Sequence, residues 1–122
     1  MNFIVENKES KVIIRCHVEK LDTLNAPELK SHFLHQSKQL FSHFIVDLSR
    51  VKYCDSSGLS ALLVGNRLAK EKKSKMILFG LQPSVEKIIS ISQLDTVFNI
   101  VSTENDIITV SYTHLTLPTK QM

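Results

Sequence analysis

Short apolar runs and longer segments of helical periodicity alternate along this chain. Two runs of β-branched and aromatic residues, 3–5 and 12–14, flank a polar stretch and predict an opening antiparallel hairpin. From residue 26 to residue 40, apolar side chains recur at helical spacing, and Asn25 stands where a side-chain N-cap is expected. The first forty residues therefore predict two strands followed by a helix.

Two further apolar runs, residues 44–48 and 76–79, show no alternation of polar and apolar positions. This pattern is typical of central strands that are covered on both faces. Between them, a segment rich in Leu and Ala from Gly58 to about Lys72 has the broad apolar face of a packed helix. A strand, a helix of this length and a second strand form a crossover, so we expect the two strands to be parallel.

The rest of the pattern predicts how the domain ends. Pro83 opens another helix, residues 97–100 form a last strand, and residues 102–106 begin a final helix with cap-forming and acidic side chains. Residues 111–122 depart from this pattern and are interpreted as a C-terminal tail, either appended or disordered, with an extra edge strand as the alternative. The sequence thus predicts one α/β domain over residues 1–110, with a mixed sheet of four to five strands, an N-terminal hairpin and about four helices.

Composition narrows the class of protein. Of the 122 residues, 43% are hydrophobic, and the net charge of +3 is too small a basic excess to indicate nucleic-acid binding. The longest apolar stretches fall far short of the roughly 20 residues that span a bilayer, and the N-terminus lacks a signal-peptide pattern. Cys16 and Cys54 form no motif for zinc or for a disulfide framework. We therefore expect a cytoplasmic domain with no metal, no cofactor, no membrane span and no direct contact with nucleic acid.

The residues with the clearest chemical potential are Asp55, Ser56, Ser57 and Gly58, which lie between a predicted strand and a predicted helix. The carboxylate and the hydroxyls can accept hydrogen bonds from the unpaired amides of a first helical turn. Gly58 would let the backbone turn tightly and leave the preceding hydroxyl uncovered. Alone, these four residues indicate no more than an ordinary helix cap.

A longer stretch around this motif is more specific. Residues 44–63, FIVDLSRVKYCDSSGLSALL, closely resemble the central signature of STAS domains of bacterial anti-sigma factor antagonists. The resemblance extends upstream to Leu21-Asp22 and downstream to ILFGL at 77–81, in consistent order over residues 3–108. It implies the STAS fold, in which the helices pack on the mixed sheet.

The resemblance also implies a regulatory protein and not an enzyme. In that family the second serine of the motif, here Ser57, is phosphorylated by the anti-sigma factor, which is an ATP-dependent serine kinase, and a metal-dependent serine phosphatase reverses the modification. The unphosphorylated form binds the anti-sigma factor and releases the sigma factor, and phosphorylation switches this binding off. A weak homodimer is left open. The residues assigned to partner binding are Asp22, Asp55, Ser56, Ser57 and Gly58.

Several alternatives stay open at this stage. STAS domains also serve as accessory subunits of lipid or anion transport systems and as scaffolds in stress signalling. Asp22 would otherwise be a turn residue before the helix, and Ser56 a residue that shapes the motif. A hydrolase that used Ser57 or Cys54 would need a base and an oxyanion arrangement, which no spacing indicates. Because Asp22 and Asp55 would make the surface acidic, we expect a phosphate on Ser57 to repel the partner without refolding the domain.

Overall fold

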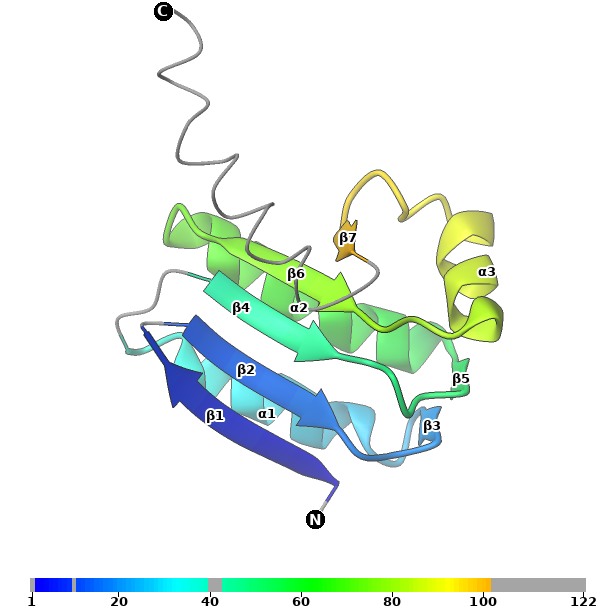
Figure 1. The fold of residues 1–122 in the computed structure, drawn as a ribbon, viewed down its shortest axis with the longest axis horizontal. Helices are drawn as coiled ribbons and strands as arrows, with labels where there is room; N and C mark the ends of the chain where they lie inside the picture. The colour runs from blue at the N-terminus through cyan, green and yellow to red at the C-terminus, as the bar shows by residue number, and fades with distance from the viewer. Residues whose placement is uncertain (1, 10, 40–42, 102–122) are drawn as a thin grey trace, which may run out of the picture.

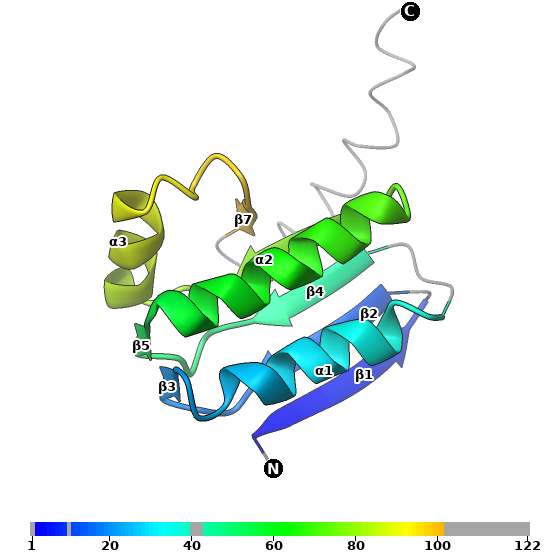
Figure 2. The same cartoon turned by 180° about the vertical axis from the view of Figure 1, so that it is seen from behind.

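A five-stranded mixed sheet forms the centre of the molecule, and two helices cover one of its faces (Figure 1, Figure 2). The structure, a computed structural model, describes residues 2–9, 11–39 and 43–101. Its elements follow one another as β1 (Phe3–Lys8), β2 (Lys11–Cys16), β3 (Lys20–Leu21), α1 (Ala26–Gln36), β4 (His43–Asp47), β5 (Tyr53–Cys54), α2 (Ser56–Glu71), β6 (Lys75–Phe79), α3 (Pro83–Ile91) and β7 (Asn99–Val101). The predicted final helix from residue 102 and the tail 111–122 lie outside the described residues.

The main sheet has the strand order β1-β2-β4-β6-β7. β1 is antiparallel to β2, and the other neighbouring pairs are parallel, which confirms both the opening hairpin and the parallel crossover through α2. β4 is the central strand, and its residues 43–46 are all buried, as its continuous apolar pattern predicts. The last strand begins two residues later than the predicted 97–100, because the amides of Val97 and Phe98 donate to the Leu94 carbonyl in a turn.

The larger cluster of buried residues lies between the sheet and the two helices α1 and α2, which run side by side on one face (Figure 2), and a smaller one is formed by Ile45, Ile77, Phe79 and Val101 of β4, β6 and β7. From α1, Leu29 and Phe33 are fully buried, and the Phe33 ring lies 5.4 Å from that of Phe44 on β4. Within the two segments predicted as helices from their apolar spacing, 26–40 and 58–72, Leu34 and Leu63 are 48% and 36% exposed. The sheet covers only one side of each helix, so the buried face of each helix is narrower than the apolar face predicted from the sequence.

A second, two-stranded parallel sheet was not predicted. It joins β3 to β5, with Lys20 opposite Tyr53 and Leu21 opposite Cys54. It lies beyond the carboxyl ends of β2 and β4 (Figure 1), and its inner residues Leu21 and Cys54 are buried in the core. Since α1 follows β3 and α2 follows β5, this small sheet brings the first turns of the two helices together.

Candidate functional site

The serine motif lies within the first turn of α2. This helix begins at Ser56, so the expectation that the motif precedes the helix is wrong by two residues. Asp55 is the N-cap, and its Oδ1 accepts hydrogen bonds from the amides of Ser57 at 2.9 Å and Gly58 at 3.1 Å. The capping chemistry predicted for the motif is therefore confirmed, with the carboxylate alone providing it.

Gly58 does not form the tight turn that was predicted for it. Its backbone is helical, and among the described glycines the positive φ belongs to Gly80, so no tight turn depends on Gly58. A Cβ at this position would lie 2.5 Å from the Leu21 carbonyl oxygen and 2.7 Å from the Cys54 Sγ. The missing side chain thus lets α2 approach the β3–β5 sheet closely.

The turn that leads from β3 into α1 is held by side-chain hydrogen bonds. Asp22 Oδ1 accepts from the Leu24 amide at 3.0 Å. Asn25 Oδ1 accepts from the Asp22 amide at 3.0 Å, and its Nδ2 donates to the Lys20 carbonyl at 2.6 Å. Asn25 occupies the N-cap position of α1, but its side chain makes no cap hydrogen bond. The predicted side-chain cap is wrong because the amide group connects the turn to β3 instead.

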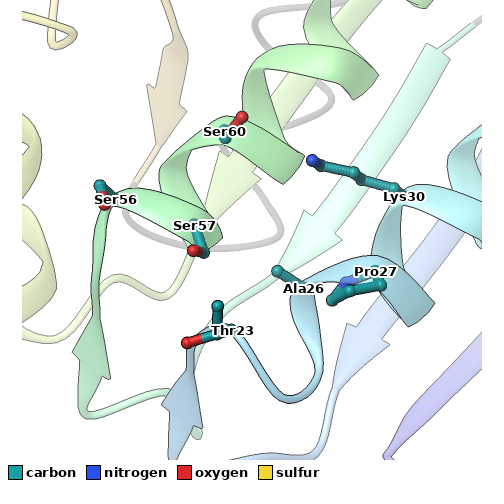
Figure 3. Close-up of a pocket in the computed structure, with 7 residues that line it drawn as sticks. All are labelled: Thr23, Ala26, Pro27, Lys30, Ser56, Ser57 and Ser60. Carbon is teal, nitrogen blue, oxygen red and sulfur yellow. The ribbon is translucent and has the colours of Figure 1, made fainter.

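An open groove of about 400 Å³ lies between the first turns of α1 and α2. Figure 3 shows Ser57 beside Thr23, with the Lys30 side chain reaching from α1 toward α2. The residues that line the groove are Thr23, Ala26, Pro27, Lys30, Ser56, Ser57 and Ser60.

The predicted site residues divide into two groups. Ser56 and Ser57 line the groove, whereas Asp22, Asp55 and Gly58 are not part of its lining and contribute through the backbone: the two carboxylates hold the turns that begin α1 and α2, and Gly58 allows the close approach of α2 to β3. Neither Asp22 nor Asp55 is part of the lining, and both carboxylates accept backbone amides. Both residues are partly exposed and adjoin lining residues in the chain, so the acidic surface expected around Ser57 stays a prediction. The charged lining residue is a cation, Lys30.

Sequence reasoning missed the half of the groove that α1 supplies. Residues 26, 27 and 30 on α1 and residues 56, 57 and 60 on α2 share the same spacing of i, i+1 and i+4. Such positions lie on one side of a helix. Matched stripes of small or polar residues at two helix starts were a usable signal, but only the β3–β5 pairing shows that the two stripes face each other.

Neither cysteine has the properties of a reactive thiol. Burial, reinforced by the Asp55 carboxylate, raises the pKa of Cys54 to about 12. Burial also raises the pKa of Cys16 well above its usual range. Both thiols therefore stay protonated near neutral pH, whereas a cysteine nucleophile reacts as the thiolate.

Two other kinds of site receive no support from the described residues. Residues 2–9, 11–39 and 43–101 contain no group of three or more His, Cys, Asp or Glu side chains placed to hold a metal ion. Within the same ranges no helix has the length and apolar character needed to cross a membrane.

Comparison with known proteins places this geometry in context. A family model, that of the STAS domain, matches residues 2–107. The anti-sigma-B factor antagonist of Listeria monocytogenes is 26% identical over 112 residues, an alignment that covers 87% of this chain and 95% of that protein. The solved structure of the anti-sigma factor antagonist SpoIIAA in its unphosphorylated form has a TM-score of 0.75 and 24% identity, covering 88% of this chain and 95% of that one. An anti-sigma factor antagonist from Mycobacterium paratuberculosis has a TM-score of 0.78 and 20% identity, covering 90% and 92%.

Proposed function

This chain belongs to the STAS domain family, whose model spans residues 2–107, and on that premise we propose that it acts as an anti-sigma factor antagonist. In this proposal the unphosphorylated chain binds an anti-sigma factor that is also a serine kinase, and the bound sigma factor is released. Phosphorylation of Ser57 ends this binding, and a metal-dependent serine phosphatase restores it. The similarity to the Listeria anti-sigma-B factor antagonist, over 95% of that protein, supports the regulatory class.

The position of Ser57 carries the proposal. It is half-buried in the first turn of α2, where its amide is bound by the Asp55 carboxylate. Within the described residues its hydroxyl takes part in no hydrogen bond, and it lines an open groove. A phosphoryl acceptor needs such a hydroxyl: fixed by the backbone and reachable from solvent. Ser56 is more exposed and lies farther from α1 (Figure 3).

The electrostatics at the start of α2 suit a reversible phosphate. The positive end of the helix dipole and the Lys30 ammonium favour the added charge of about −1.5 to −2, while the nearby Asp55 carboxylate opposes it. The fold should therefore tolerate the modification. A partner that enters the groove would meet a large, hydrated dianion in place of a small hydroxyl, so we expect phosphorylation to block the interface without refolding the domain.

The groove is poorly suited to hydrolysis, which supports a binding role. Its lining within the described residues contains no carboxylate and no imidazole. The carboxylate next to Ser57, that of Asp55, accepts the amides of Ser57 and Gly58 as the cap of α2, and no hydrogen bond joins it to the Ser57 hydroxyl that a general base would have to deprotonate. The nearest thiol, Cys54, is buried and protonated. We therefore propose that the chain accepts a phosphoryl group and transfers none.

The test is phosphorylation by a candidate anti-sigma factor serine kinase from the same genome. Incubation with that kinase and Mg-ATP, followed by peptide mass spectrometry, should place one phosphoryl group on Ser57. Ser57→Ala should abolish the modification, whereas the matched controls Ser56→Ala and Ser60→Ala should keep it. Modification of Ser56 or Ser60 would refute the assignment of Ser57. Stable binding without phosphorylation would instead favour a transport accessory subunit or a signalling scaffold.

A further inference from the structure

We propose that Leu24 is the apolar anchor through which the anti-sigma factor grips this chain, an inference that rests on the proposed function. Leu24 is 91% exposed, the highest value among the large apolar residues that the structure describes. A single exposed leucine is common on protein surfaces and by itself indicates nothing. Its setting in the β3–α1 turn is what points to recognition.

The turn fixes Leu24 in place without using its side chain. The Leu24 amide donates to Asp22 Oδ1 at 3.0 Å, and the amide of Ala26 donates to the Asp22 carbonyl at 2.7 Å. The Asn25 side chain connects this turn to the Lys20 carbonyl and the Asp22 amide. An apolar group held in one backbone conformation loses little entropy when a partner binds it, which is the property of a good anchor.

Leu24 is also continuous with the phosphorylation groove. Its neighbour Thr23 lines the groove and lies beside Ser57 (Figure 3). On β5, Tyr53 is 47% exposed and pairs in register with Lys20 of β3, so an exposed aromatic side chain lies on the small sheet from which the Leu24 turn leads. A kinase that brings the γ-phosphate of ATP to Ser57 must cover Thr23, and the adjoining Leu24 then lies at its surface. The occupant we assign is therefore an apolar pocket of that kinase, and neither a second copy of this chain nor a lipid.

Titration calorimetry with the kinase that phosphorylates Ser57 tests this. ADP replaces ATP, so that Ser57 stays unmodified. Burying an exposed leucine is worth enough that Leu24→Ser should weaken binding by about 10- to 100-fold. Leu24→Met should bind nearly as wild type, since it restores an apolar side chain of similar volume. Ile91→Ser is the matched control, because Ile91 is 70% exposed at the far end of α3 and should not affect binding.

A kinetic readout separates anchoring from folding. With ATP present, Leu24→Ser should raise the KM for phosphorylation of this chain and leave kcat unchanged, because Leu24 contacts the kinase in both the ground and transition states. The melting temperature should match that of the wild type for all three variants. Equal affinity of Leu24→Ser and wild type, or an equal loss for Ile91→Ser, would overturn the inference. If the wild-type chain does not bind at all, the proposed function falls and this inference falls with it.

Discussion

Replacing Gly58 with alanine should destabilise the domain, although alanine is the better helix former. The new methyl group would lie 2.5 Å from the Leu21 carbonyl oxygen and 2.7 Å from the Cys54 Sγ. Neither neighbour is free to move. The carbonyl accepts the Asp55 amide at 3.2 Å, and Leu21 and Cys54 are buried partners in the β3–β5 sheet. The strain must therefore separate α2 from β3.

The magnitude follows from three contributions. Overpacking of a filled site costs about 1–3 kcal/mol. Lengthening the hydrogen bond from Asp55 to Leu21 costs about a further 1 kcal/mol, while the helix preference for alanine over glycine offsets up to about 1 kcal/mol. We therefore expect Gly58→Ala to lower the free energy of unfolding by about 1–3 kcal/mol.

Urea unfolding followed by circular dichroism measures this loss. Ser60→Ala is the matched control, because residue 60 is exposed in the same helix, and it should change the free energy of unfolding by no more than about 0.5 kcal/mol. A Gly58→Ala protein as stable as the wild type would refute the reasoning. It would show that helix preference outweighs the contact and that α2 does not approach β3 as closely as the structure has it.

Three further predictions concern stability. Asp55→Ala removes the α2 cap and should lower the free energy of unfolding, measured with urea, by about 1 kcal/mol. An unchanged urea midpoint would show that the cap does not stabilise the domain. The raised pKa of Cys54 implies that stability falls as the pH rises from about 9 toward about 12, because the unfolded thiol ionises there and the folded one does not; Cys54→Ala should reduce this alkaline loss. Arg15→Met removes ion pairs to Glu6 at 2.7 Å and Asp47 at 3.0 Å, and should cost about 1 kcal/mol at low salt and less at high salt, a difference that urea midpoints would reveal.

The main sheet was predictable because its strands carry long patterns. In β2, β4 and β6, the order of apolar and polar residues over five or six consecutive positions indicates which side chains are buried. The helical segment between β4 and β6 then requires these two strands to be parallel. The β3–β5 sheet escaped prediction because two residues per strand contain no periodicity to read. It is defined by long-range pairing, which depends on how the larger sheet places its ends.

Only the part of the candidate site that belongs to one local motif could be predicted from the sequence. The serines and the Asp55 cap belong to one local motif, so their positions followed from neighbouring residues. Lys30 and Thr23 reach the groove from another part of the chain, and no local pattern could assign them to it. Gly58 shows a different limit: its value comes from a carbonyl group 37 positions earlier in the sequence, at Leu21, which only the folded chain brings near.

The construction of the β3–α1 turn has a consequence for substitutions at position 24. Its shape depends on Asp22, Asn25 and backbone groups, and the Leu24 side chain takes no part in holding it. Substitutions at position 24 should therefore leave the folded turn intact. Under the proposed function, exchanging this one side chain would change partner choice while the turn that presents it keeps its shape.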